Sequence, residues 1–113
     1  MAVTTKVLCE ATVIALDPAT TTMYTAPSGT VTIIDKLTVT NYSASSATVV
    51  VYIIPSGGSV IDANALVKKT LAAKEVYTCP EIVGHNLATG DAIVSKADAV
   101  TAVSLRASGR EVT

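Results

Sequence analysis

The alternation of apolar and polar residues between positions 30 and 41 constrains the fold more than any other feature of this sequence. One parity is apolar, at Val31, Ile33, Leu37 and Val39, and the other is mostly threonine. Successive side chains of a β-strand point to opposite faces. The pattern therefore predicts a strand with one face in a core and one face in solvent. Ile34 and Asp35 interrupt the alternation, and we expect a β-bulge there.

Composition and turn spacing extend this prediction to the whole chain. The apolar residues are mostly Val, Ala and Ile, threonine is abundant, and Phe and Trp are absent. β-Branched residues favour strands over helices. Turn-forming residues recur about every eight to twelve positions, a spacing typical of sandwiches and jelly rolls. We predict an all-β fold, a single antiparallel β-sandwich that is jelly-roll-like and has about eight strands.

The length of 113 residues corresponds to one domain. Because the first residues carry little pattern, we expect an N-terminal arm over residues 1–10 and a β-sandwich domain over residues 11–113. Strands are expected at 10–16, 20–25, 30–41, 47–54, 67–71, 75–79, 92–96 and 100–107. Residues 30–41 and 47–54 should pair as a hairpin. Residues 60–66 fit either one helical turn or a crossing between sheets, and residues 108–110 should end the last strand before a short tail.

The segment Ala47–Ile54 is apolar at both parities, apart from one threonine. Such a strand is covered on both faces, either as a central strand of its own domain or with a partner subunit on one side. Val3 and Val7 would contact a neighbour if the arm orders on assembly, unless this end of the chain is simply frayed. The candidate interface residues are Val3, Val7, Val49, Val50, Val51, Tyr52, Ile53 and Ile54.

Charge and hydropathy argue against several classes of partner. The formal net charge is -1, and Lys68–Lys69 is the only adjacent basic pair, so a nucleic-acid surface is not expected. Four tyrosines are the only aromatic residues, which leaves few stacking platforms for bases or sugars. No apolar run approaches the roughly 20 residues that span a bilayer. The first residues lack the layout of a signal peptide, so we expect synthesis in a cytoplasm and no membrane partner.

The residues that could act in catalysis or bind a metal do not form the pattern of a known type of site. Cys79 and His85, six residues apart, come nearest to a nucleophile and its base. Asn86 would point to the opposite strand face from His85 and could not orient it. Asp62 and Asn64 fall short of the several oxygen ligands of a calcium loop, and no pair of carboxylates stands out. We therefore predict a non-enzymatic chain with no cofactor, no metal site and no small-molecule substrate.

Cys9 and Cys79 are the only cysteines. Two distant cysteines in a reducing compartment are usually free, buried thiols, which is our expectation here. A disulfide between them is the alternative. No second Cys or His lies at metal-ligand spacing from either of them.

Several short motifs at turns and strand ends are similar to those of a known protein family. They are Tyr24–Thr30 (YTAPSGT), Ile33–Leu37 (IIDKL), Thr40–Asn41, Tyr52–Gly58 (YIIPSGG), Gly84–Leu87 (GHNL), Gly90–Ile93 (GDAI) and Leu105–Gly109 (LRASG). Together they resemble small β-sandwich proteins encoded among the virion genes of tailed bacteriophages. The resemblance extends from Tyr24 to Glu111, which is most of the chain.

This resemblance implies a structural role in the phage particle. For a stand-alone domain of this size it implies a capsid decoration, or cement, protein that binds and stabilises the head surface as a homo-oligomer. The implied partners are the major capsid protein and copies of the chain itself. The implied location is the capsid surface of the virion, after synthesis in the host bacterial cytoplasm. The alternative is a structural or host-recognition module at the tail or head–tail junction, where Tyr42 and His85 would face a carbohydrate.

Overall fold

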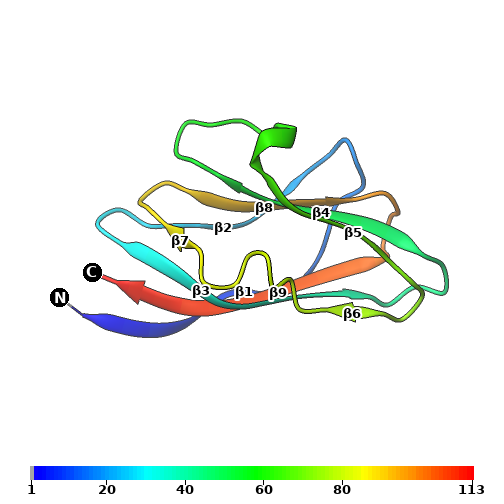
Figure 1. Ribbon diagram of the computed structural model, residues 1–113, viewed down its shortest axis with the longest axis horizontal. Coiled ribbons are helices and arrows are strands. Elements are labelled where there is room, and N and C mark those ends of the chain that lie inside the picture. The colour runs from blue at the N-terminus through cyan, green and yellow to red at the C-terminus, as the bar shows by residue number, and fades with distance from the viewer. Residues whose placement is uncertain (1) are drawn as a thin grey trace.

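Two antiparallel β-sheets packed face to face make up the described chain, residues 2–113 of a computed structural model (Figure 1). Sheet A has the order β1 (Val3–Val13), β9 (Val103–Val112), β3 (Val31–Asn41) and β6 (Val76–Tyr77), and β7 (Asn86–Leu87) also pairs with β3. Sheet B has the order β2 (Thr21–Thr25), β8 (Ala92–Ala97), β4 (Ala47–Ile54) and β5 (Ala65–Leu71). The predicted antiparallel β-sandwich is confirmed.

The strand pairs are nested in the manner of a jelly roll. The first strand pairs with the last, β2 with β8, β3 with β6 and β7, and β4 with β5. Because β6 and β7 together occupy one strand position, the nine strands fill eight places. One turn of 3-10 helix, η1 (Asp62–Asn64), lies between β4 and β5, within the segment where the sequence allowed a helical turn.

The expected bulge in β3 is present, but it reverses the predicted orientation of the first half of the strand. The register against β9 shifts between Ile34 and Lys36. One extra residue moves every side chain before it to the other face. Thr32 is therefore fully buried while Val31 is 44% exposed, so the prediction that Val31 and Ile33 face the core is wrong. The buried residues of β3 are Thr32, Ile34, Leu37, Val39 and Asn41.

The predicted hairpin between residues 30–41 and 47–54 is also wrong, because β3 and β4 belong to different sheets. Asn41 anchors the crossing. Its buried side-chain amide donates hydrogen bonds to the carbonyl oxygens of Ser45, Leu71 and Ala72, and its side-chain oxygen accepts from Ser43. The polar loop after β3 is thereby fixed to the end of β5 in the opposite sheet, instead of turning back along β3.

Gly109 continues the last strand instead of ending it. Strand β9 extends to Val112, so the predicted break at residues 108–110 is wrong. A Cβ atom added at Gly109 would overlap the carbonyl oxygen of Ile33 and come within 3.1 Å of a Leu8 methyl carbon. Glycine is required here because the neighbouring strand and the Leu8 side chain approach the backbone too closely for any side chain.

The N-terminal residues lie along the edge of sheet A. Strand β1 runs without interruption across the expected boundary between arm and domain, and pairs with β9 from Val3 opposite Val112 to Val13 opposite Ser104. Leu8 and Cys9 are both buried because a bulge follows Val7. Most of residues 1–10 are thus ordered in the sandwich, and their action as an assembly arm stays a prediction.

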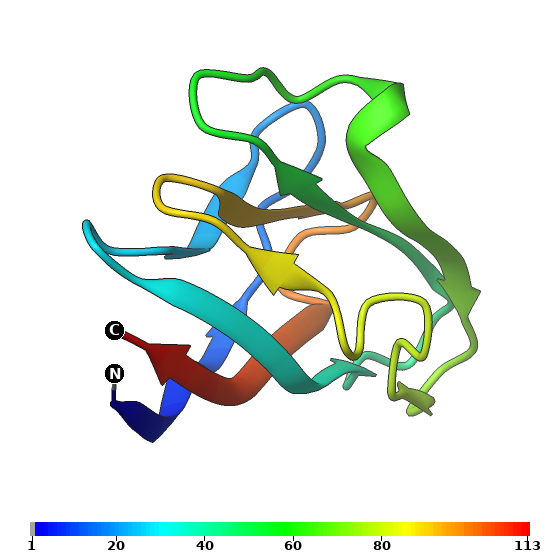
Figure 2. The ribbon, with the colours of Figure 1, turned by 60° about the vertical axis from the view of Figure 1, so that its left-hand side comes forward.

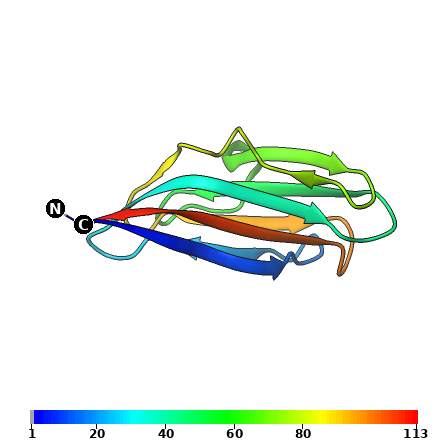
Figure 3. The ribbon, with the colours of Figure 1, turned by 90° about the horizontal axis from the view of Figure 1, so that it is seen from below.

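Both ends of the described chain lie at the same end of the molecule, where β1, β9 and β3 run side by side (Figure 3). The opposite layer, sheet B, carries the long connection between β4 and β5, which stands away from sheet A (Figure 1, Figure 2). Within residues 2–113, none of the helical structure has the length and apolar character needed to cross a membrane.

Candidate interaction surface

The predicted interface residues are distributed over two separate parts of the molecule. Val3 and Val7 lie on β1 and are 58% and 41% exposed. In β4, Val50 and Ile53 are half-buried. The remaining members, Val49, Val51, Tyr52 and Ile54, are buried. The structure therefore does not bring the eight residues together, and the β4 members offer little surface to a partner.

The outer face of β4, which points away from the main core, also carries buried apolar side chains. Tyr52, Ile54 and Val94 form a small apolar cluster on the outer face of sheet B, separate from the main core. The connection formed by residues 55–64 approaches this cluster, and Pro55 and Val60 line one hollow with Ile54 and Val94. The burial of Tyr52 and Ile54 is therefore achieved within the described chain, and a partner contact at β4 stays a prediction.

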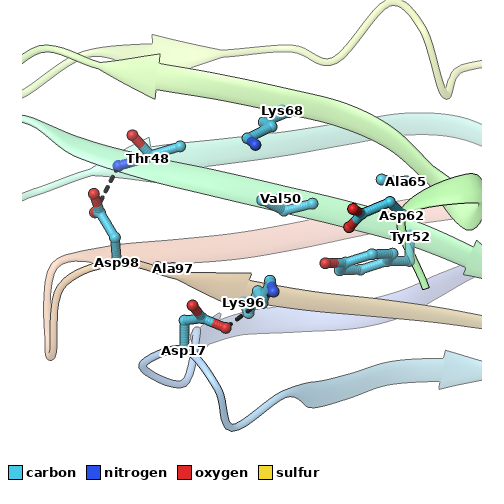
Figure 4. Close-up of a pocket in the computed structure, with 10 residues that line it drawn as sticks. All are labelled: Asp17, Thr48, Val50, Tyr52, Asp62, Ala65, Lys68, Lys96, Ala97 and Asp98. Atoms are coloured by element: carbon cyan, nitrogen blue, oxygen red, sulfur yellow. Dashed lines mark hydrogen bonds and ion pairs between the residues drawn. The ribbon is translucent and has the colours of Figure 1, made fainter. Parts of the chain in front are cut away.

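A polar hollow of about 560 Å³ lies beside this cluster, on the outer face of sheet B (Figure 4). Lys96 forms an ion pair with Asp17 at 2.9 Å, and its ammonium lies 5.8 Å from the centre of the Tyr52 ring. The hydrogen bond to Asp17 is the main cause of the raised pKa of Lys96. Asp98 accepts a hydrogen bond from the backbone N–H of Thr48 at 2.7 Å. Much of the polar lining is thus already engaged within the protein.

Sequence reasoning assigned no role to the charged residues of this hollow. Lys68 on β5 and Lys96 on β8 are both opposite Val50 in the strand register, one on each side of β4. Lys68, Val50 and Lys96 are aligned across the sheet only because β5 and β8 are the two neighbours of β4. The order of strands in a sheet is not contained in the local pattern, so the only available signal was the polar parity of each strand.

A cluster of apolar side chains, three of them exposed and two half-buried, lies on the outer face of sheet A, at the end that carries both termini. Val3, Val112 and Val31 are opposite one another in the register of β1, β9 and β3. Ile33 belongs to the next row of the same face, and Val7 lies four residues after Val3 on β1. These five residues, Val3, Val7, Val31, Ile33 and Val112, are called the valine patch below.

The side chains around the valine patch neutralise one another. Arg110 makes a two-pronged ion pair with Asp35, with Nε–Oδ2 and Nη2–Oδ1 distances of 3.0 Å each, and this contact raises the pKa of Arg110. On the inner side of the same strands, Lys6 lies 3.3 Å from Glu111. The border of the patch therefore carries opposite charges in pairs.

A buried hydrogen-bond network supports the strands beneath the patch. The Tyr24 hydroxyl, on β2 of sheet B, donates to Glu111 at 2.5 Å and accepts from the Thr32 hydroxyl at 2.8 Å. Burial, followed by the bond to Glu111, raises the pKa of Tyr24 to about 12. The same bond is the main cause of a lowered pKa at Glu111. The network ties β2 to β3 and β9, so both sheets hold this end of the sandwich in place.

The residues that the sequence offered as a nucleophile, a base or metal ligands form no site in the structure. Cys79 is fully buried, and its burial raises the pKa of the thiol to about 12, so it stays protonated at neutral pH. His85 is exposed in a loop. Cys9 and Cys79 are free thiols, as expected. The Asn64 amide donates to the backbone oxygen of Ser59. Across residues 2–113, no three His, Cys, Asp or Glu side chains lie together as a metal site would require.

Comparison with known proteins identifies no family. No family model matches the sequence, and no curated protein matches it. Two solved structures of infectious bursal disease virus, of the Gx and Gt strains, are similar over 97% of this chain, with 14% and 12% sequence identity and TM-scores of 0.42. The chain spans about a third of the length of those two chains, 31% and 32%. Values this low assign neither a family nor a function.

Proposed function

We propose that this chain is a structural protein of a tailed bacteriophage particle, a capsid decoration protein that binds the outside of the head as a homo-oligomer. Its partners would be the major capsid protein and copies of itself. The observation that carries the proposal is the valine patch, an exposed apolar surface held on a rigid end of the sandwich. The phage context comes from the turn and strand-end motifs between Tyr24 and Glu111.

The valine patch suits a contact between proteins. Val3, Val7 and Val31 are 58%, 41% and 44% exposed, and burying each of them would contribute roughly 1 kcal/mol. Such a contact is weak in one copy. A particle presents many symmetric sites, and a ligand that binds only the assembled shell stabilises that shell by mass action. A modest apolar surface, bordered by charges that pair within the protein, fits this mechanism.

Cryo-electron microscopy of the purified phage particle tests the proposal. We expect density for the sandwich at repeated positions on the head, with the end that carries the valine patch against the shell. Density restricted to the tail or the portal axis would overturn it. A pelleting assay with purified heads adds a matched pair of variants. Val31→Lys should reduce head binding, whereas Val100→Lys should not, because Val100 is 71% exposed and lies in the turn before β9, at the other end of that strand.

The second candidate function is a carbohydrate-binding module for host recognition at the tail. The observation in its favour is the polar hollow on sheet B, where Lys68 and Asp62 are available beside the Asp17–Lys96 pair. Against it, Tyr52 is only 2% exposed, so its ring offers no open face for a sugar to stack on. A glycan array with the wild-type protein and a Lys68→Ala variant distinguishes the two functions. Binding to a glycan that is lost in the variant would favour the tail module.

A further inference from the structure

Strand β1 forms one edge of sheet A, with β9 on its inner side and no strand of the described chain on its outer side. Ala2 and Thr113 exchange both backbone hydrogen bonds, each 2.9 Å long. In an antiparallel pair such bonded positions alternate with positions whose N–H and C=O groups point away from the neighbour. Residues 4 and 6 therefore bond to β9, while Val3, Thr5 and Val7 direct their backbone groups to the free edge.

We propose that two copies of this chain pair through these free edges, antiparallel and related by a two-fold axis at Thr5. In this register Thr5 lies opposite Thr5 of the partner subunit, and Val3 lies opposite Val7 of the partner subunit. Every paired position is one whose N–H and C=O groups are directed outward. Each of the three residues then donates and accepts one hydrogen bond, so the backbone of residues 3–7 is fully satisfied.

The side chains favour the same register. Val3 and Val7 both belong to the valine patch on the outer face, so each valine would pack against a valine of the second copy. The two patches would join into one apolar strip across a continuous sheet. On the inner face, Lys6 would lie opposite Thr4 of the partner subunit, and no like charges would face each other. The segment is self-complementary because its two valines are equally far from Thr5.

Edge strands usually carry features that prevent pairing, such as bulges, prolines and inward charges. In β1 the register shifts occur only after Val7, between Val7 and Cys9 and between Cys9 and Thr12. Residues 3–7 are regular and contain no proline. The open half of the edge therefore coincides with the half that is self-complementary. For its role on the particle the inference rests on the proposed function, since it names the self-contact of that homo-oligomer.

The test is the oligomeric state of the full chain by sedimentation equilibrium, with two matched double variants. Wild-type protein should be a dimer. In Val3→Lys/Val7→Lys, lysines face lysines twice across the interface, and the dissociation constant should rise by about tenfold or more. In Val3→Lys/Val7→Glu, each lysine faces a glutamate, and dimerisation should be restored to within a few-fold of wild type. Both variants remove the same two valines, and circular dichroism checks that both remain folded.

A wild-type chain that stays monomeric at the highest soluble concentration would overturn the inference. So would two double variants that are weakened equally, since the register of Val3 against the partner's Val7 predicts that they differ. Head binding is measured separately in the pelleting assay. A dimer that does not bind heads would refute the proposed function and leave the pairing intact. A monomer that binds heads would refute the pairing and the homo-oligomer, and would leave only the head binding of the proposed function.

Discussion

Tyr24→Phe removes one hydroxyl group that joins the two sheets. In the folded chain this group lies between the Thr32 hydroxyl and the Glu111 carboxylate, at 2.8 and 2.5 Å. The phenylalanine ring keeps the apolar contacts of a side chain that is only 9% exposed. The variant therefore isolates the contribution of the hydrogen bonds from the contribution of packing.

The size of the effect follows from the two partners. A hydrogen bond to a charged group contributes about 1.5–3 kcal/mol, and a buried hydroxyl left without a partner costs about 1–3 kcal/mol. Thr32 is fully buried, so it would lose its partner without gaining water. These two costs overlap, and we expect a net loss of about 2–3 kcal/mol. Since unfolding entropy is about 2.1 cal/mol/K per residue, this loss lowers Tm by about 8–12 °C.

The loss should depend on pH in a defined direction. Glu111 has a lowered pKa, first because of the bond from Tyr24 and further because of Lys6. A lowered carboxyl pKa gives stability that is present above the unfolded value of about 4.3 and is lost as pH falls through the folded pKa. The difference between wild type and Tyr24→Phe should therefore be largest near neutral pH and should narrow in acid. At the alkaline end, the raised pKa of Tyr24, about 12, gives stability that is lost as pH rises above about 10.

Urea unfolding followed by circular dichroism, at pH 7 and at pH 3, measures both parts of this prediction. Tyr42→Phe is the matched control, because it removes the same atom from a side chain that is 37% exposed, and it should change stability by less than about 0.5 kcal/mol. A Tyr24→Phe loss no larger than that of the control would refute the reasoning. A loss of equal size at both pH values would refute the role given to Glu111.

Three further changes test the fold and the edge strand. Val51→Asp places a charge at a fully buried position and should prevent folding, and a soluble variant with native circular dichroism would contradict the burial. Gly109→Ala creates the overlap with the Ile33 carbonyl and should cost about 1–3 kcal/mol or more in urea unfolding, whereas Ser108→Ala should be nearly neutral. Deleting residues 1–9 should leave a folded but less stable sandwich that neither dimerises nor binds heads, and complete unfolding would show that β1 is essential to the core.

The class of fold could be predicted from local pattern. Which face of the first half of β3 lies in the core could not. Alternation located the strand, and the interruption at Ile34 and Asp35 located the bulge. The expectation that the apolar parity of a strand faces the core then placed Val31 in the core. The structure instead buries Thr32, whose hydroxyl bonds to Tyr24. A hydroxyl is acceptable in a core when a buried partner satisfies it, and that partner lies on a different sheet.

The pairing of strands depended on contacts between distant residues. The polar loop between β3 and β4 is short enough for a hairpin, and local sequence favours one. Asn41 instead holds the chain in a crossing between sheets, because its amide donates to the carbonyl oxygens of Leu71 and Ala72, about thirty residues away. The double covering of β4 was predicted correctly from its composition. Its source, residues 55–64 of the same chain, could not be recognised because those residues carry few apolar side chains.

Of the valine patch, sequence reasoning found Val3 and Val7 and missed Val31, Ile33 and Val112. Val31 and Ile33 were placed in the core by their parity, and Val112 was placed in a tail because Gly109 was interpreted as a strand end. Both errors have the same origin. Gly109 is opposite Ile34 in the register, at the bulge, so the close approach that requires glycine and the reversal of parity in β3 are one local feature of sheet A.

This feature links the candidate interaction surface to the buried network. On β3, Val31 lies in the outward row with Val112, and Thr32 lies in the next, inward row with Glu111. Without the extra residue of the bulge, Val31 and Thr32 would exchange faces, so that Thr32 would leave Tyr24 and Val31 would enter the core. The exposure of Val31 and the buried hydrogen bond of Thr32 therefore arise from the same backbone irregularity. A surface built in this way is held by the core beneath it, as a rigid docking surface requires.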